Sequence, residues 1–289
     1  MSSPLPSDIP EIFDRAARRR RRDRAAPTFA DFDFLRAAML EGIADRLASV
    51  THRFTDRLDL GCFDGALPVP EGVAVTRCDA GALFAAQAGG VQADEDRLPF
   101  APGSFDLVIS AGVLDSVDDL PGALTLIRRA LRPDGLFLAA FCGAGTLATL
   151  RSVLREAERE RPAARVHPQI DVRSAGDLLM RAGFALPVAD IEALTVRYSS
   201  IGGILRDLRG MGATNVLRAR TPLRRDTLAR AAELFAAHAD PDGKTPERFD
   251  LIYLTGWSPA PSQPKPARRG SGTASLEGAL RRPPGVSET

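Results

Sequence analysis

The hydrophobic residues of this chain follow two different spacings. Between residues 27 and 50 they recur at steps of three and four positions, at Phe34, Leu35, Met39, Ile43 and Leu47. This spacing predicts an amphipathic helix, and Asp33 stands where a capping residue would begin it. Short apolar runs, bounded by Gly, Pro or Asp, follow at residues 57–60, 73–79, 90–94, 104–110 and 136–141. Each of these runs predicts a strand.

The rest of the chain continues to mix the two spacings. Helical spacing recurs at residues 120–131, 145–160, 174–184, 201–212 and 224–240, and strand-like runs recur at 186–198 and 248–257. The proline and glycine of "RPDG" would end the first of these helices. Strands that alternate with helices or loops imply crossover units and a parallel sheet. We therefore expect an α/β, Rossmann-like fold with a mostly parallel seven-stranded sheet, N-terminal helices and a helical insertion before the last strand.

These elements divide the chain into four parts. Residues 1–50 form an N-terminal helical segment, 51–145 a cofactor-binding core, 146–257 a C-terminal part with the insertion and the last strands, and 258–289 a tail. The tail is rich in Pro, Ser, Gly and Arg, a composition that cannot bury a core, so we expect it to be mostly disordered.

Charge and residue content exclude several classes of function. The 38 basic and 37 acidic residues nearly cancel, so the whole chain does not favour nucleic acid as a partner. Three cysteines and three histidines are scattered without metal-ligand spacing or a disulfide framework, which predicts no metal site and a reducing, cytoplasmic location. No eighteen apolar residues run together, so no transmembrane segment is expected.

Five consecutive arginines, Arg18 to Arg22, follow "IFDRAA" near the N-terminus. Such a run serves either as a nucleic-acid or targeting patch or as the solvated face of a helix. No aromatic residues alternate with these arginines, as they would in a surface that stacks bases. We therefore expect a helix whose arginines face solvent.

Polar residues follow the ends of the first four strands. Asp59 and Gly61 close the first strand, Asp79 the second, Asp94 with Glu95 the third, and Ser110 the fourth. In an open parallel sheet, ligands bind at the carboxyl ends of the strands. An acid about 20 positions after a glycine turn can accept hydrogen bonds from a ribose diol, which suits Asp79, and Asp94 is placed for the amine of an adenine. The alternative is that each aspartate only stabilises a turn.

Five segments of the chain resemble class I S-adenosylmethionine (SAM)-dependent methyltransferases. They are "LDLGC", "ADEDRLPF", "SFDLVIS", "DLPGALTLIRRALRPDG" and "FCGAGTLATLR". Within this superfamily the chain is most similar to the complex I assembly factor 5 family, a relative of the malonyl-carrier methyltransferase of biotin synthesis. "IFDR" at residues 12–15, "DLRGMGATN" at 207–215, "IYLTGW" at 252–257 and the basic tail around "RRGSGTAS" carry this similarity.

The resemblance implies a fold, a cofactor and a biological role. It implies the class I methyltransferase fold with SAM bound, Gly61 and Gly65 in the turn beside it, Asp79 on its ribose and Asp94 near its adenine. It also implies a protein substrate in respiratory complex I assembly, with a complex I subunit as the candidate, and the family is associated with hydroxylation of an arginine. No general base for methyl transfer can be named, and Asp115 is a catalytic candidate by position alone.

Two segments depart from that family near the cofactor. Phe63 stands in the middle of the glycine turn, where close approach of the backbone to a cofactor favours glycine. Pro68 and Pro70 lie in the seven-residue link after Gly65, which is too short for the first crossover helix. Strand two then either pairs differently, or the link runs along the sheet edge. We expect SAM to bind weakly or not at all.

Three functions remain open from the sequence. They are a SAM-dependent methyltransferase acting on a protein, a non-catalytic assembly factor with a degenerate methyltransferase fold, and a protein arginine hydroxylase. Asp115 and Ser116 stand where relatives in the family carry an aromatic or histidine pair that faces substrate, so the lining of the active site is also changed. Methyl transfer is favoured because the strand-end acids and the flanking glycines are retained.

Overall fold

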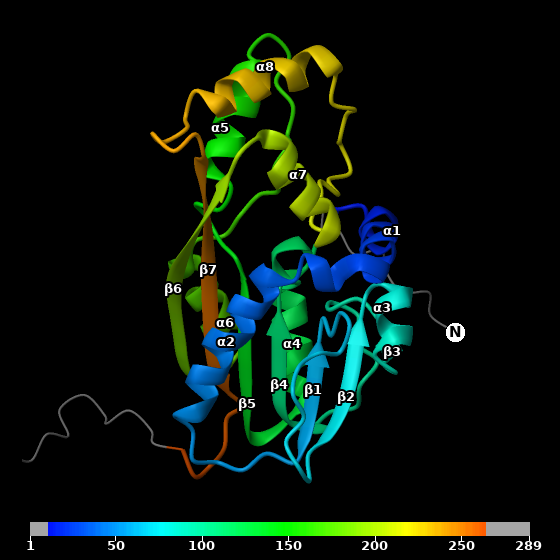
Figure 1. The fold of residues 1–289 in the computed structure, drawn as a ribbon. Coiled ribbons are helices and arrows are strands. Elements are labelled where there is room, and N and C mark those ends of the chain that lie inside the picture. Colours follow the sequence, from blue (N-terminus) through cyan, green and yellow to red (C-terminus); the bar gives the residue numbers. More distant parts are fainter. Residues whose placement is uncertain (1–10, 264–289) are drawn as a thin grey trace, which may run out of the picture. The chain divides into compact units, whose positions relative to one another are not determined.

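Seven strands form one sheet in the order β3-β2-β1-β4-β5-β7-β6 (Figure 1). The computed structural model describes residues 11–263. The strands are β1 (Asp56–Leu60), β2 (Ala74–Asp79), β3 (Val91–Gln92), β4 (Phe105–Ala111), β5 (Leu131–Cys142), β6 (Ala185–Tyr198) and β7 (Thr245–Trp257). β7 runs antiparallel to both of its neighbours, and the other neighbouring strands pair in parallel. The expected mostly parallel, seven-stranded α/β fold is confirmed.

Helices precede, connect and follow these strands. They are α1 (Arg15–Ala25), η1 (Ala26–Asp31), α2 (Phe34–Ala48), α3 (Ala82–Gln87), η2 (Leu114–Ser116), α4 (Leu120–Ala130), α5 (Ala148–Ala157), α6 (Val172–Arg181), α7 (Ile201–Gly210) and α8 (Arg225–Ala236). α7 and α8 lie between β6 and β7, which confirms the helical insertion before the last strand. Within the described residues, none of the helices is long and apolar enough to cross a membrane. Most of the expected tail, at 264–289, lies outside those residues.

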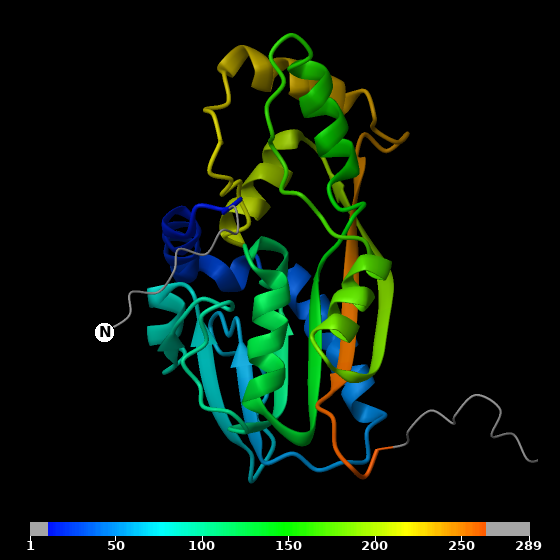
Figure 2. The ribbon, with the colours of Figure 1, turned by 180° about the vertical axis from the view of Figure 1, so that it is seen from behind.

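The helices cover both faces of the sheet. α4 and α6 pack on the face seen in Figure 2, where Leu124 and Leu179 join one core. α2 packs on the opposite face, where Met39 joins a second core. Successive side chains of a strand point to opposite faces, so on β4 Val108 joins the first core and Ile109 the second. α1 and α7 lie beyond the carboxyl ends of the central strands, where the sequence places a ligand site (Figure 1).

The link between β1 and β2 contains no helix. Residues 61–73 are irregular, yet β2 pairs with β1 in parallel along the whole of β1. The absence of the first crossover helix is thus confirmed, and the alternative that strand two pairs differently is wrong. Nη2 of Arg57 donates a hydrogen bond to the carbonyl oxygen of Pro68 at 2.7 Å, which ties the proline-bearing link back to β1.

Three local features differ from the sequence expectation. α3 and η1 were not expected, because six residues are too few to show helical spacing. β5 begins at Leu131, directly after α4, so "RPDG" lies inside this strand, at a register shift in its pairing with β4. The side chain of Asp33 makes no capping hydrogen bond to α2, although the helix begins where the apolar spacing predicts.

Candidate functional site

Four acidic side chains line the carboxyl ends of β2 and β3. Asp79 ends β2, and Asp94, Glu95 and Asp96 follow shortly after β3. Their side chains are at most 3% exposed. We call these four residues the acid row. The sequence predicted site roles for the first three of them, and the structure brings those three together at one edge of the sheet.

One face of α1 covers the acid row. The arginines at positions 15, 18, 19 and 22 lie on this face because they are spaced by three, one and three residues. Each makes its shortest ion pair with a different acid: Arg15 with Asp96 at 2.5 Å, Arg18 with Glu95 at 2.7 Å, Arg19 with Asp94 at 2.6 Å and Arg22 with Asp79 at 2.5 Å. Planar guanidinium groups match carboxylates in geometry, so a row of charge-assisted hydrogen bonds holds α1 on the sheet.

The expectation that Arg18 to Arg22 all face solvent is wrong. The side chains of Arg18 and Arg22 are only 7% and 6% exposed, because each meets a buried carboxylate that compensates its charge. Arg20 and Arg24 are exposed, as expected for a solvated face. The arginine run therefore has an inner face bound to the acid row and an outer face that is not.

Asp79 has no free acceptor position. Its carboxylate oxygens accept hydrogen bonds from Nε and Nη2 of Arg22 at 2.7 and 2.5 Å, from the amide of Phe63 at 3.1 Å and from the amide of Gly81 at 2.7 Å. An ionised carboxylate offers about four lone-pair positions. The residue that the sequence assigns to a ribose diol is therefore fully satisfied by its own chain.

Phe63 fills the space above the turn that follows β1. Its buried ring stacks on Phe29 with 4.6 Å between ring centroids and meets Phe84 at 5.2 Å. The guanidinium carbon of Arg22 lies 4.1 Å from the centroid of the Phe63 ring, a cation–π contact. The backbone φ of Phe63 is 50°, in the left-handed region that favours glycine. The ring thus points into the site rather than away from it.

The glycines that flank Phe63 keep the conformation of a tight turn. Gly61 and Gly65 both have φ of 76°. A Cβ atom on Gly61 would lie 2.5 Å from Cγ1 of Val113, so a larger residue would displace that side chain. The path of the backbone expected for a nucleotide-binding turn is retained, although Phe63 occupies its middle.

Asp59 and Ser110 do not join the acid row. Asp59 points to the face that α2 covers, where Nη2 of Arg36 lies 3.8 Å from its Oδ1, and burial raises its pKa. Oδ2 of Asp59 and Oγ of Ser110 are buried and have no hydrogen-bond partner within residues 11–263. Neither residue pairs with an arginine of α1. The structure therefore does not gather all of the predicted site residues into one place.

Little space remains between α1 and the glycine turn. A cavity of about 60 Å³ lies beside Arg18 and Arg22 and is also lined by Asp115 and His167. Pockets for ligands of the size of SAM enclose roughly 300–1,000 Å³. SAM does not fit the site in this arrangement, because α1 and Phe63 take up both its volume and its hydrogen-bond partners.

Asp115 and His167 are two titratable residues of this cavity whose pKa values are shifted mainly by burial. Burial raises the pKa of Asp115 to about 6, although the charges of Arg18 and Arg22 oppose the shift. Burial, with the charge of Arg18, lowers the pKa of His167 to about 4. Nε2 of His167 accepts a hydrogen bond from the amide of Val216 at 3.0 Å, so the neutral ring carries its proton on Nδ1. Asp115 is thus suited to proton transfer near neutral pH.

Sequence reasoning missed the arginines of α1 and His167 as parts of this site. The sequence did contain a signal for the arginines: Arg15, Arg18, Arg19 and Arg22 are spaced so that they share one helical face. Their number equals that of the acids in the acid row. His167 gave no such signal, because it lies in an irregular segment far from the strand ends in sequence. The described part of the chain contains no group of three or more His, Cys, Asp or Glu residues that could hold a metal ion.

Comparisons with known proteins agree on one family. Residues 58–139 match the family described as a methyltransferase domain. The chain is 36% identical over 285 residues to the zebrafish (Danio rerio) protein named arginine-hydroxylase NDUFAF5, mitochondrial. This match covers 92% of this chain and 88% of the relative. It is 31% identical over 271 residues to the malonyl-[acyl-carrier protein] O-methyltransferase of Methylovorus sp.. That match covers 86% of this chain and 90% of the relative.

A solved structure shares the fold. A candidate methyltransferase of Bacillus halodurans superposes with a TM-score of 0.55 at 15% identity, and the match covers 76% of this chain and 99% of that one. At this identity the likeness concerns the fold alone.

Proposed function

We propose that this chain, which belongs to the methyltransferase-fold family of NDUFAF5 and the malonyl-[acyl-carrier protein] O-methyltransferases, acts in respiratory complex I assembly. In this role it binds a protein partner and does not use SAM. The role in complex I assembly is supported by the segments at residues 12–15, 207–215 and 252–257, which resemble the complex I assembly factor 5 family. Of the three functions left open by the sequence, this proposal corresponds to the non-catalytic assembly factor.

The saturation of Asp79 carries this proposal. A ribose diol would have to displace both hydrogen bonds from Arg22, and the adenosyl group would have to displace the ring of Phe63. Removing α1 from the sheet would also separate the acid row from its cationic partners. Removing one partner of a buried ion pair costs about 3–5 kcal/mol, and two of the four pairs, Arg18 with Glu95 and Arg22 with Asp79, are buried on both sides, so opening them would require a large compensating interaction.

The acid row favours a second candidate function, recognition of an arginine in the protein partner. It already binds four guanidinium groups of its own chain, and relatives of this chain carry the name arginine-hydroxylase. The side chain of Arg19 is 42% exposed, the highest value among the four arginines. A partner's arginine would therefore replace Arg19 on Asp94 with the least disturbance of the fold.

Calorimetric titration of SAM into the full-length protein tests the main proposal. We expect no saturable binding at millimolar SAM. Binding at micromolar SAM by the unmodified chain would overturn the proposal and restore methyl transfer as the leading function.

A complementation experiment tests the role in assembly. In a strain that lacks this protein, the double variant Arg22→Gln, Asp79→Asn keeps the shape of the buried pair but removes the carboxylate that a ribose would need. We expect this variant to support complex I assembly as the unmodified protein does. A folded variant that fails to support assembly would contradict a role without SAM.

Titration with N-acetyl-arginine amide tests the second candidate. We expect the variant Arg19→Ala, which frees Asp94, to bind this probe more tightly than the unmodified chain. Arg20→Ala is the matched control, because Arg20 is exposed on the outer face of α1. Equal affinity of both variants for the probe would rule out the acid row as a site for an added arginine.

A further inference from the structure

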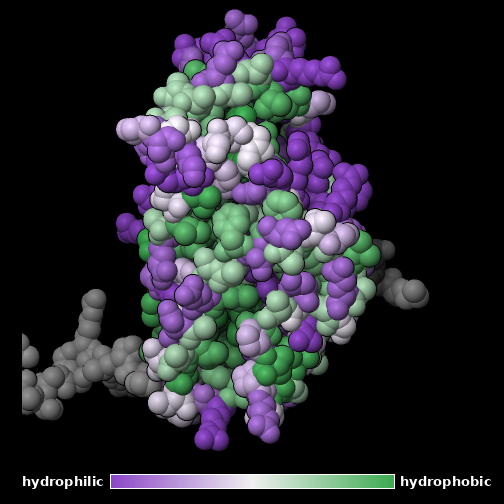
Figure 3. Space-filling view, in the orientation of Figure 1, coloured by the Kyte–Doolittle hydropathy of each residue, from purple (hydrophilic) through white to green (hydrophobic). Residues whose placement is uncertain are grey.

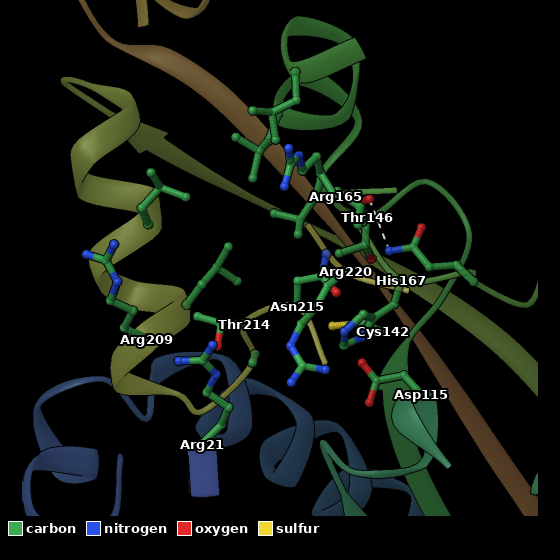
Figure 4. Close-up of a pocket in the computed structure, with 18 of the residues that line it drawn as sticks. Arg21, Asp115, Cys142, Thr146, Arg165, His167, Arg209, Thr214, Asn215 and Arg220 are labelled. Atoms are coloured by element: carbon green, nitrogen blue, oxygen red, sulfur yellow. Dashed lines mark hydrogen bonds between the residues drawn. The ribbon is translucent and has the colours of Figure 1, made fainter. Parts of the chain in front are cut away.

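A second, larger pocket shares Asp115 and His167 with the small cavity beside α1 (Figure 4). Its volume is about 540 Å³, within the range of small-molecule sites. One wall is apolar and comes from α2, α5, α7 and β7, through Leu35, Leu150, Leu154, Leu205, Leu208 and Phe249. The function proposed above makes no use of this pocket.

Two arginines without partners line the same pocket. The side chains of Arg21, from the outer face of α1, and Arg209, from α7, make no ion pair or hydrogen bond with any residue between 11 and 263. Figure 4 shows both of them, with Thr214, on one side of the pocket and Asp115 on the other. Oγ1 of Thr214 is buried and also has no hydrogen-bond partner in that range. Three donors are thus available on one side of the pocket.

The positive charge around Arg21 is not balanced. Burial and the charges of Arg24, Arg220, Arg20 and Arg209 all lower the pKa of Arg21. Of these neighbours, only Arg220 forms an ion pair with a carboxylate of residues 11–263, that of Asp14 at 2.9 Å. Arginines of the inner face of α1, by contrast, each meet a carboxylate of the acid row. An anion placed between Arg21 and Arg209 would therefore relieve a repulsion that no described side chain relieves.

The opposite side of the pocket fixes the orientation of a ligand. Asp115 carries a carboxyl group that repels an anion whenever it is ionised. An anionic group is therefore favoured on the side of Arg21 and Arg209, and the apolar wall lies between these two sides. A ligand that satisfies both features has one oxyanion and an apolar body.

We propose that this pocket binds a small organic oxyanion, a carboxylate or a phosphate monoester with an apolar body, through Arg21, Arg209 and Thr214. The site differs from the SAM site of the fold, because its lining comes mainly from α5, α7 and the irregular segments beside them and includes no residue of the acid row. The proposal is independent of the proposed function, since it requires neither a protein partner nor the absence of SAM binding.

Calorimetry with four probes tests the proposal. Octanoate and octyl phosphate carry both features, octanol carries only the apolar body, and inorganic phosphate carries only the charge. We expect octanoate or octyl phosphate to bind more tightly than octanol and inorganic phosphate, and the better of the two distinguishes a carboxylate site from a phosphate site. Octanol binding as tightly as both anions, or inorganic phosphate binding as tightly as octyl phosphate, would overturn the proposal.

A pair of double variants locates the binding. The double variant Arg21→Gln, Arg209→Gln removes two charges that line the pocket. Because each charge-assisted hydrogen bond to an anion contributes to the binding free energy, we expect the affinity for the anionic probes to fall at least about tenfold. Arg20→Gln, Arg24→Gln removes two charges from the exposed surface of α1 that do not line the pocket. This control should keep its affinity within about twofold. An equal loss in both double variants would show general charge attraction and reject the site.

The folded state of the variants can be checked separately. Arg21 and Arg209 have no partner within the described residues, so their replacement leaves no buried group unpaired, and the thermal midpoint should not fall. A loss of binding with an unchanged midpoint then reports on the pocket and not on the fold.

Discussion

Arg22 and Asp79 form a bidentate ion pair between the first helix and the second strand of the sheet. Nε and Nη2 of Arg22 donate to the two oxygens of Asp79 at 2.7 and 2.5 Å, and the side chains are only 6% and 0% exposed. Charged side chains are almost never this buried unless they are paired. The pair therefore couples the position of α1 to the one carboxylate that a nucleoside cofactor would need.

Replacing Arg22 by alanine should strongly destabilise the protein. Asp79 would remain buried with two of its four hydrogen bonds lost, and Phe63 would lose the closer of the two guanidinium groups that contact its ring. Removing one partner of a buried ion pair costs about 3–5 kcal/mol, and we expect Arg22→Ala to lower the free energy of unfolding by this amount. Guanidinium chloride denaturation measures the difference.

Two further variants serve as controls for Arg22→Ala. Arg20→Ala removes an arginine from the outer face of the same helix and should change the free energy of unfolding by less than about 0.5 kcal/mol. Adding Asp79→Asn to Arg22→Ala removes the buried charge and should recover part of the lost stability. If Arg22→Ala were as stable as Arg20→Ala, the pair would not hold α1 on the sheet.

Substitutions of Phe63 separate the contribution of its ring from the strain of its backbone. Both Phe63→Ala and Phe63→Gly remove the stacking on Phe29, which should cost about 3–5 kcal/mol for the alanine variant. Because φ is 50°, glycine avoids a left-handed strain of about 1–2 kcal/mol, so Phe63→Gly should be the more stable of the two.

Phe29 provides the matched comparison for this pair of variants. It lies in the helical turn η1, where glycine is disfavoured. Phe29→Gly should therefore be less stable than Phe29→Ala, the reverse of the order at position 63. Thermal or chemical denaturation gives both orders, and a Phe63→Gly variant that is less stable than Phe63→Ala would show that backbone strain at Phe63 is negligible.

The parts of this site that follow from the sequence are those with a local signal. Asp79 and Asp94 could be placed at one edge because the ends of parallel strands meet there. The missing crossover helix followed from Pro68 and Pro70, whose effect on the backbone is also local. The seven strands and the helical insertion followed from apolar runs of regular length.

The partners of the acid row could not be predicted in the same way. Arg22 precedes Asp79 by 57 positions and Arg15 precedes Asp96 by 81 positions, so no local pattern connects them. The orientation of Phe63 likewise depends on Phe29 and Phe84, which approach it only in the folded chain. A run of arginines has the same spacing whether it faces water or carboxylates, and only the tertiary contacts decide between the two.

The variant Asp115→Asn should change how stability depends on pH. The pKa of Asp115 is raised from 3.8 to about 6, so the folded state binds a proton more tightly than the unfolded state. Ionised Asp115 therefore lowers stability above pH 6, by up to about 3 kcal/mol, and this penalty vanishes as the pH falls from 6 to below 4. Asparagine carries no such charge.

We therefore expect Asp115→Asn to be more stable than the unmodified protein at pH 7.5 and to lose this advantage toward pH 4. Chemical denaturation of both proteins across this range measures the difference. A constant difference at all pH values would show that Asp115 has an ordinary pKa. Asp226→Asn is a matched control, because Asp226 is exposed on α8 and the pKa of its carboxyl is lowered by hydrogen bonds instead.

His167 should give a pH dependence of the opposite sign. Its pKa falls from 6.5 to about 4 in the folded protein, so the unfolded chain binds the extra proton more tightly. Stability linked to His167 is complete above pH 6.5 and is lost as the pH falls toward 4, by up to about 3 kcal/mol. Between pH 4 and 6 this loss and the gain from protonation of Asp115 largely cancel in the unmodified protein.

The variant His167→Gln removes one side of this cancellation. Glutamine can still accept the hydrogen bond from the amide of Val216, but it loses the ring contact with Phe13, so we expect it to be about 1 kcal/mol less stable at pH 7.5. This deficit should shrink as the pH falls below 6.5 and should reverse at about pH 5.8, where the loss linked to His167 reaches about 1 kcal/mol. Nuclear magnetic resonance of the imidazole provides an independent measurement: a His167 ring that titrates near pH 6.5 in the folded protein would contradict both its burial and the predicted reversal.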